Sequence, residues 1–141
     1  MYMLFGSHDD KVGDYSSKWF SEKQQLPVVP PFSTITWLDN NNKILGVALF
    51  NDYTGSSIEL HIHLITGLTL SKIKCIHNYV FEQLKCNILI AKPARKSTSL
   101  LKMLARSGFI FLAIIPRYYG NTKSNDAVLY YIDKQSAYRW K

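Results

Sequence analysis

The sequence predicts an α+β protein whose sheet is mostly antiparallel, and three observations predict it. Residues 33–65 hold three stretches rich in β-branched and aromatic side chains, separated by turn-forming residues. Apolar residues then recur at three- and four-residue steps over 69–85 and again over 97–107, which is typical of amphipathic helices. Residues 109–132 return to β-forming composition. This order of elements is typical of an α+β class.

The first three strands are expected to form a meander, because short turn tracts separate them. We predict strands over 33–38, 44–53 and 58–65. The tracts between them are Asp39-Asn40-Asn41-Asn42 and Thr54-Gly55-Ser56-Ser57, whose residue types tolerate tight turns.

The helices and later strands follow from the change of period. The stripe of the first helix, 69–85, consists of Leu70, Ile73, Ile76, Val80 and Leu84. A short buried strand is expected at 88–91. The second helix should present Leu101, Leu104 and Ala105 on one face and end at Gly108, which suits a left-handed C-cap. Two strands, 109–115 and 127–132, complete the order β-β-β-α-β-α-β-β.

Residues 1–32 are expected to hold an N-terminal strand or helix and a proline-rich crossing. Asp14 is a candidate cap for a short helix over 15–25, with Trp19 and Phe20 as apolar contacts. Three prolines within 26–31 forbid a helix there. The whole chain, 1–141, is predicted to be a single domain.

Charge is spread unevenly along the chain. Residues 1–70 carry a net charge of −3, whereas residues 71–141 carry +10. An anionic ligand or partner is therefore expected at the second half, and a solvated basic face is the alternative. The two cysteines lack C-x-x-C spacing and no apolar run reaches the ~20 residues of a membrane-spanning helix, so a reduced, cytoplasmic protein that does not enter the membrane is expected.

Four segments carry a resemblance to a known family: 97–109, which ends in Gly108-Phe109, 117–119, 126–130 and 46–50. They resemble the GNAT (GCN5-related N-acetyltransferase) superfamily, and most of all the short GNAT-like proteins encoded by tailed bacteriophages. In this resemblance, 97–109 is similar to the family's fourth-helix segment, 117–119 and 126–130 to its final hairpin, and 46–50 to the strand before the acetyl-CoA-binding one. The resemblance covers about 33–141. It implies a three-layer α/β/α fold with a mixed sheet, acetyl-CoA as co-substrate and an amine acceptor; a phage protein would lie in the host cytoplasm or the virion.

The resemblance also implies where acetyl-CoA binds and where this chain departs from the family. The pyrophosphate loop corresponds to 65–71, with one glycine where the family usually has two, and the family's catalytic tyrosine is replaced by Leu104. The pantetheine arm is expected to pair with the third strand where it splays from 88–91. The cofactor-binding residues this implies are Ile62, Leu64, Ile65, Thr66, Gly67, Leu68, Thr69, Leu70, Ser71, Ser97 and Leu101.

Three polar residues alternate along the third strand and therefore share one face: Glu59, His61 and His63. His and a buried Glu both suit proton abstraction near neutral pH, so Glu59 and His61 are the base candidates. A backbone N–H near His63 is expected to polarise the thioester carbonyl. Tyr130 is a candidate acid in place of Leu104.

Other interpretations stay open. The polar strand face is equally compatible with a solvated or helix-covered surface, and His61-x-His63 with half of a metal site, although no third and fourth ligand accompany it. His77 is expected to be structural. A scaffold that has lost turnover, such as a phage particle component, and a nucleic-acid-binding or nucleic-acid-modifying protein are the alternative functions. The latter would stack bases on the C-terminal aromatics Tyr118, Tyr119, Tyr130, Tyr131, Tyr138 and Trp140.

Overall fold

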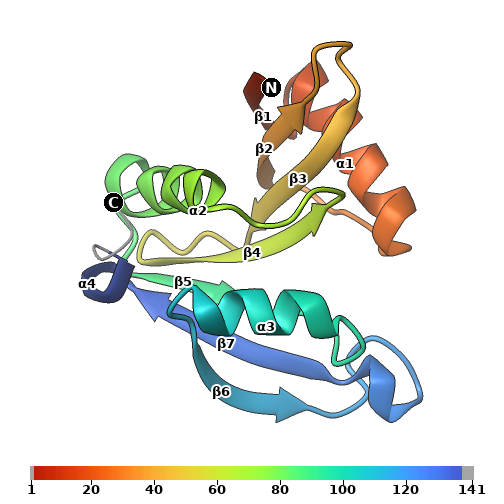
Figure 1. The fold of residues 1–141 in the computed structure, drawn as a ribbon, viewed down its shortest axis with the longest axis vertical. Coiled ribbons are helices and arrows are strands. Elements are labelled where there is room, and N and C mark those ends of the chain that lie inside the picture. Colours follow the sequence, from red (N-terminus) through yellow and green to blue (C-terminus); the bar gives the residue numbers. More distant parts are fainter. Residues whose placement is uncertain (1, 138–141) are drawn as a thin grey trace. The chain divides into compact units, whose positions relative to one another are not determined.

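The fold was obtained as a computed structural model that describes residues 2–137 (Figure 1). Its elements are β1 (Tyr2–Ser7), α1 (Lys11–Gln24), β2 (Phe32–Leu38), β3 (Ile44–Asn51), β4 (Ser57–Leu64), α2 (Leu70–His77), η1 (Asn78–Gln83), β5 (Ile88–Ala91), α3 (Thr98–Arg106), β6 (Ile110–Ile115), η2 (Lys123–Asn125), β7 (Ala127–Asp133) and α4 (Lys134–Ala137). The strands follow the order β1-β2-β3-β4-β5-β7-β6 in one sheet. The predicted α+β class and element order are confirmed. None of the described helices is long and apolar enough to cross a membrane.

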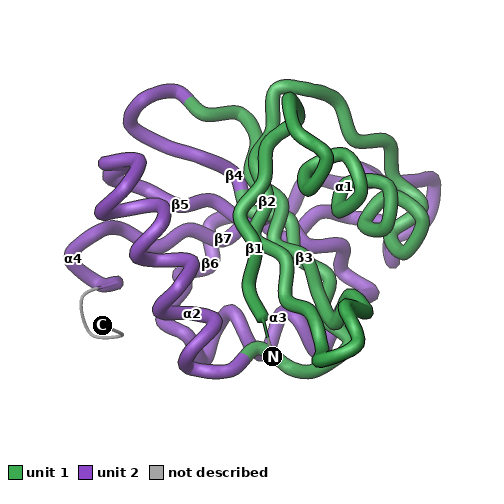
Figure 2. Tube along the Cα trace, turned by 90° about the horizontal axis from the view of Figure 1, so that it is seen from above, with its two compact units in different colours: residues 1–53, 60–68 green, residues 54–59, 69–141 purple. Residues whose placement is uncertain are grey.

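The chain divides into two compact units, shown in different colours in Figure 2. Unit 1 comprises residues 1–53 and 60–68, and unit 2 comprises 54–59 and 69–141. Strand β4 supplies residues to both, so the boundary falls inside a strand and not in a linker. Two compact units therefore subdivide the chain that the sequence predicted as one domain.

Unit 1 is a meander covered by one helix. β1 pairs antiparallel with β2, from Tyr2 opposite Leu38, and β2 pairs antiparallel with β3, from Phe32 opposite Asn51. Helix α1 packs on these three strands. Its contacts enclose an apolar core formed by Phe20, Phe32, Leu38, Ile44, Val47 and Leu49, with Trp19 and Val28 at its margin.

Helix α1 begins four residues before the predicted start at Tyr15. Asp10, not Asp14, is the N-cap: its carboxylate accepts a 2.8 Å hydrogen bond from the Gly13 backbone N–H. That bond and a second one from the Ser7 backbone lower the pKa of Asp10. The predicted cap was wrong because Asp14 lies within the first turn of the helix, where it forms an ion pair with Lys18.

Unit 2 begins with the start of β4 beside β5. The Asn87 N–H donates to Ser56 O over 2.7 Å, and farther along the same segments Glu59 contacts Lys92. The two segments therefore run in the same direction. Because β5 and β6 each pair antiparallel with β7, the sheet is mixed, as predicted. Helix α3 runs along this part of the sheet (Figure 1) and ends at Gly108, whose φ of +90° is the expected left-handed cap.

The first predicted helix of unit 2 changes its winding partway. It is α-helical to His77 and then widens over η1, where Leu84 N bonds to Tyr79 O five residues earlier. Its buried side chains include Ile73, Ile76, Val80 and Phe81. Leu70 was wrongly placed in the buried stripe, because as the first helical residue it remains half exposed.

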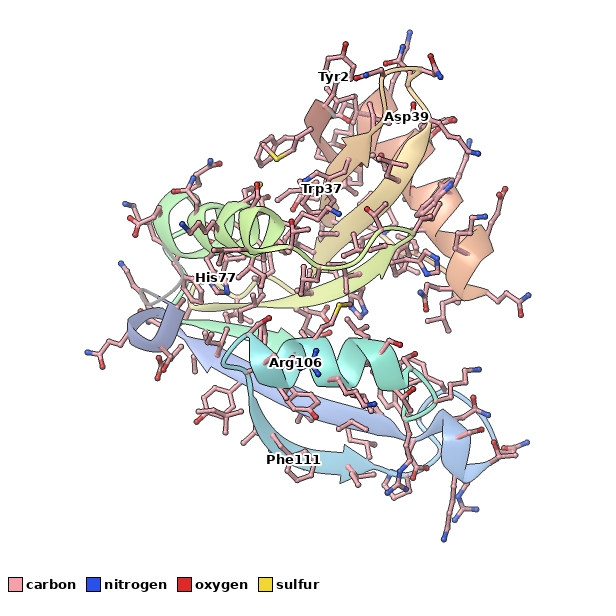
Figure 3. The ribbon with its side chains drawn as sticks, in the orientation of Figure 1. Tyr2, Trp37, Asp39, His77, Arg106 and Phe111 are labelled. Atoms are coloured by element: carbon pink, nitrogen blue, oxygen red, sulfur yellow. The ribbon has the colours of Figure 1, made fainter. Side chains whose placement is uncertain are left out.

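The burial of α3 and β5 differs from the sequence prediction. On α3, Leu104 is buried and Leu101 half-buried, but Ala105 is exposed because it falls off the packed face. β5 alternates buried Leu89 and Ala91 with more exposed neighbours, whereas a fully buried strand was expected. β6 is an edge strand with exposed apolar side chains, among them Phe111, labelled in Figure 3.

Candidate functional site

The polar face predicted on β4 is present. Burial alternates along the strand: Ile58, Leu60 and Ile62 are buried, while Glu59, His61 and His63 are half-buried. A strand turns successive side chains to opposite faces, so these three polar side chains share one face. Glu59 belongs to unit 2, and His61 and His63 belong to unit 1.

His61 is oriented by Asn51 at the end of β3. The His61 Nε2 atom lies 3.0 Å from Asn51 Oδ1, and an amide oxygen can only accept, so Nε2 donates. In the neutral ring the lone pair is then on Nδ1. This arrangement supplies an imidazole with one fixed donor and one basic nitrogen, which is the requirement for a general base.

His63 is held by two side chains of α1. Its Nδ1 lies 2.6 Å from Gln24 Nε2, so the amide donates and His63 carries its proton on Nε2. The Trp19 ring meets the imidazole edge to face, with centroids 5.5 Å apart and an interplanar angle of 71°. Burial first, and then the charge of Lys23, lower the pKa of His63, so the ring is neutral at neutral pH.

The backbone of β4 offers one edge to β3 and one away from it. Ile65 N–H donates to Leu45 O over 2.8 Å, so Ile65 faces β3. Since backbone groups alternate along a strand, the N–H and C=O groups of Leu64 and Ile62 face the opposite edge. Gly46 permits the β3–β4 approach, because a Cβ there would overlap the Leu64 side chain and lie 3.2 Å from His63 O.

Glu59 forms a nearly buried ion pair with Lys92, at the end of β5. The Lys92 Nζ atom lies 2.8 Å from Glu59 Oε1, and the two side chains are 13% and 17% exposed. The same ammonium donates to Tyr118 Oη over 3.1 Å. Burial alone lowers the pKa of Lys92, but the hydrogen bonds to Glu59 and Tyr118 outweigh it and the net pKa is raised. Lys92 therefore stays charged, and Glu59 has a cation to release before it can act as a base.

The tyrosines of unit 2 are placed differently from one another. The Tyr119 hydroxyl donates to Lys92 O, and burial raises the pKa of Tyr119 to about 12. Tyr130 on β7 is half-buried against Phe111, with ring centroids 6.1 Å apart. Tyr119 and Tyr130 thus both contact other residues of unit 2. Tyr138 and Trp140 lie outside the described residues.

The segment proposed to bind pyrophosphate connects β4 to α2. Ile65, Thr66 and Gly67 are exposed and Leu68 is half-buried; these residues belong to unit 1. Thr69 is the N-cap of α2 and accepts a 3.3 Å hydrogen bond from the Lys72 N–H. Leu70 and Ser71 are the exposed first residues of the helix, where backbone N–H groups collect partial positive charge.

The remaining predicted cofactor residues belong to α3. Ser97 is the N-cap residue of this helix without a side-chain capping bond, and Leu101 is half-buried one turn later. Leu104, at the position where the resemblance expects a tyrosine, is 1% exposed and belongs to the core. Leucine has no proton to donate, so the side chain at this position cannot act as a general acid.

Three further residues are excluded from proton or thiol chemistry. Burial raises the pKa of both the Cys75 and the Cys86 thiols, which keeps them protonated at neutral pH. His77 is buried against Phe81 and Phe109, and burial lowers its pKa to about 4. The expectation that His77 is structural agrees with this burial.

Asn51, Gln24 and Lys92 are the contacts of this face that sequence reasoning missed. Each orients one of the three predicted residues, and each comes from a different element. Among residues 2–137, no group of three or more His, Cys, Asp and Glu side chains could hold a metal ion.

Comparisons with known proteins show the fold of this chain. No family model and no curated protein matches the sequence. The solved structures that match include a mutant spermidine/spermine N-acetyltransferase, SpeG, from Vibrio cholerae, with a TM-score of 0.74, 12% identity and 98% of each chain covered. A chimera of that enzyme with hSSAT gives 0.74 at 11% identity over 98% and 99%. A dodecameric SpeG gives 0.72 at 12% identity over 94% of each chain. The chain therefore has the GNAT fold that the sequence predicted.

Proposed function

We propose that this chain is an acetyl-CoA-dependent N-acetyltransferase that transfers an acetyl group to an amine by direct attack in a ternary complex. The GNAT fold supports an N-acetyltransferase, because the similar solved structures are enzymes of this class. Fold alone does not define activity. The observation that carries the proposal is the hydrogen bond of His61. Its Nε2–H donates to Asn51 Oδ1, so the lone pair of the neutral imidazole is on Nδ1.

Acetyl-CoA, as co-substrate, supplies an activated acetyl thioester. The chain offers groups that fit it: an edge of β4 at Ile62 and Leu64 whose backbone groups face away from β3, and the first turn of α2 with exposed N–H groups and Thr69. Gly67 leaves room for close approach, since nothing lies within 4 Å of a Cβ built there. We assign pantetheine pairing to Ile62 and to the C=O group of Leu64, and phosphate contacts to residues 66–71. Ser97 and Leu101, which belong to unit 2, remain predicted cofactor-binding residues.

The catalytic roles follow from these positions. His61 Nδ1 accepts the proton of the attacking ammonium, and the Leu64 N–H stabilises negative charge on the carbonyl oxygen. His63, neutral and held by Gln24, positions this part of β4. Glu59 serves as a base only if Lys92 releases it, so we place it second to His61. The thiolate receives its proton from water or from Tyr130, because Leu104 has none to give.

The test is acetyl-CoA binding followed by thiol release with a panel of amines. Binding should raise the melting temperature by mass action. The variant His61→Gln should lose ~10²- to 10⁴-fold in kcat with acetyl-CoA affinity unchanged. The control His8→Gln, in which the altered ring contacts only the Phe32 backbone and neighbouring side chains, should keep wild-type turnover. No heat and no thermal shift at millimolar acetyl-CoA would refute the proposal.

The burial of Leu104 favours a second candidate function, a GNAT scaffold that binds acetyl-CoA without turnover. Such a scaffold would suit an assembly role, including one in a phage particle. It predicts a thermal shift with acetyl-CoA but no thiol release with any amine in the panel. Turnover that depends on His61 excludes it.

A further inference from the structure

Two loops of unit 2 are joined into one surface, which we call the loop pair: residues 92–97 after β5 and residues 116–126 between β6 and β7. Backbone hydrogen bonds connect them, from Arg95 N to Asp126 O (2.8 Å) and from Lys96 N to Ser124 O (3.1 Å). Ala94 also forms an isolated antiparallel bridge with Ala127. These backbone contacts hold the two loops side by side.

The buried carboxylate of Asp126 ties both loops together. Asp126 is 5% exposed, its Oδ1 accepts from the Arg117 N–H over 2.8 Å and its Oδ2 from Arg95 Nη1 over 3.1 Å. Arg117 has a φ of +54°, a left-handed conformation that costs a non-glycine residue about 1 kcal/mol or more. The bond from its N–H to a buried carboxylate stabilises that conformation.

The loop pair carries more cations than its acids can balance. It contains Lys92, Arg95, Lys96, Arg117 and Lys123 but a single acidic residue, Asp126. Asp126 pairs with Arg95, and Glu59 of β4 pairs with Lys92. The loop pair supplies no further carboxylate for Lys96, Arg117 and Lys123, whose residues are exposed. This surface attracts anions and repels polycations.

The loop pair contacts Glu59, the base candidate that belongs to unit 2. Lys92 contacts Glu59 at 2.8 Å and lies 5.1 Å from the centroid of the Tyr118 ring. Tyr118 is 47% exposed and meets Tyr119 edge to face at 4.9 Å. An exposed aromatic ring beside fixed cations suits a ligand with an anionic group and a flat or apolar body.

We propose that the loop pair binds an anionic group, phosphate or carboxylate, of the acceptor, so that the acceptor is an amine bearing such a group and not a polyamine. The inference rests on the proposed function and narrows its substrate class. It separates this chain from the similar solved structures, which are named for spermidine. The anion of such an acceptor contacts Arg117, Lys96 and Lys123, and the ion pair between Lys92 and Glu59 joins this surface to the polar residue of β4 that belongs to unit 2.

The experiment compares amines that differ in one charged group: glucosamine 6-phosphate against glucosamine, an amino acid against its amide, and spermidine. The phosphate or carboxylate member should exceed its neutral partner at least tenfold in kcat/KM, and which pair responds distinguishes the two anions. Spermidine should be the poorest substrate. Equal or better turnover of spermidine would overturn the proposal.

A charge-neutralised variant identifies the surface. Arg117→Asn combined with Lys96→Gln and Lys123→Gln should reduce kcat/KM for the anionic amine at least tenfold, mainly through KM, and leave the neutral amine within twofold. Asparagine tolerates the left-handed backbone at position 117. The control Lys102→Gln changes an exposed cation on α3 outside the loop pair and should have no effect. An unchanged KM in the triple variant refutes the assignment.

Two outcomes keep this inference distinct from the proposed function. If acetyl-CoA does not bind but calorimetry detects glucosamine 6-phosphate or the amino acid, with binding lost in the triple variant, the anion surface stands and the acetyltransferase proposal fails. If a single-stranded oligonucleotide binds with a steep salt dependence that the triple variant abolishes, while small anionic amines do not bind, the loop pair is a nucleic-acid surface and the inference is wrong.

Discussion

The two units position their polar side chains by opposite means. In unit 1, the imidazoles of His61 and His63 form hydrogen bonds with the uncharged side-chain amides of Asn51 and Gln24. In unit 2, the corresponding groups are charges that face countercharges, as in Glu59 with Lys92. The Gln24 amide orients His63 and bonds only to its neutral ring, whereas a countercharge favours the charged state. Under the proposed function, proton transfer by His61 falls to unit 1 and the proposed recognition of an anion falls to unit 2.

This difference does not follow from the net charge of the two halves of the sequence. The first 70 residues carry −3 and the remainder +10, yet unit 1 places its imidazoles beside amides and rings and not beside acids. Unit 2 buries two carboxylates, Glu59 and Asp126, among its cations. The buried acids therefore act as fixed structural counterions.

The largest effect is expected when the ion pair between Glu59 and Lys92 in unit 2 is broken. Lys92→Met leaves the nearly buried Glu59 without its cation and should lower the free energy of unfolding by roughly 3 kcal/mol, measured by urea denaturation. The double variant Glu59→Gln/Lys92→Met should recover at least half of this loss, because no unpaired charge remains. A loss no larger than that of Lys102→Met would contradict a structural role for the pair.

An acid titration of stability should detect His77 in unit 2. Burial lowers its pKa to about 4, against a hydrogen bond to the Ala137 backbone that acts in the opposite direction. The unfolded chain binds this proton below about pH 6.5, but the native state does not until about pH 4, so stability is fully present above pH 6.5 and falls as pH drops through this window.

The fall attributable to His77 should be about 1.4 kcal/mol per pH unit, or roughly 3 kcal/mol in total. His77→Gln should flatten the curve between pH 6.5 and 4 whatever it does to stability at pH 7. His8→Gln should keep the wild-type slope. Identical slopes for wild type and His77→Gln would show that other groups cause the acid sensitivity.

Alanine substitutions at two glycines test how closely β3 and β4 pack in unit 1. Gly46→Ala places a Cβ against the Leu64 side chain and His63 O, so it should cost about 2 kcal/mol in unfolding free energy through strain between β3 and β4. The matched change Gly67→Ala meets nothing within 4 Å and should stay within about 0.5 kcal/mol. Similar costs at the two positions would mean that the β3–β4 spacing adapts freely.

The smallest expected effect concerns the amide that holds His63. Gln24→Leu removes the donor to Nδ1 and should cost about 1 kcal/mol. Because that donor bonds only to the neutral ring, its loss should also raise the pKa of His63, which a nitrogen-detected NMR titration measures. Gln83→Leu, at an exposed position of η1, serves as the control. An unaltered His63 titration and tautomer would dismiss the role of Gln24.

Local sequence patterns predicted the elements and their boundaries well where contacts between residues close in sequence determine the structure. The Asp39–Asn42 turn, the alternation along β4 and the Gly108 cap all depend on residues close in sequence. The predictions failed where a competing contact decided. Asp10 replaced Asp14 as the cap because Gly13 N lay within its reach, and the first helix of unit 2 changed to a wider turn at Asn78.

The alternation of β4 alone determined that Glu59, His61 and His63 share one face, since side-chain direction in a strand has a period of two. The tertiary structure decided what each of them does. It brought Glu59 into an ion pair with Lys92, 33 positions away, and placed Leu104 in the core. It also joined His61 to Asn51 and His63 to Gln24 by hydrogen bonds. Such partners depend on packing between distant segments, and no spacing within the sequence encodes their distances or their effect on protonation.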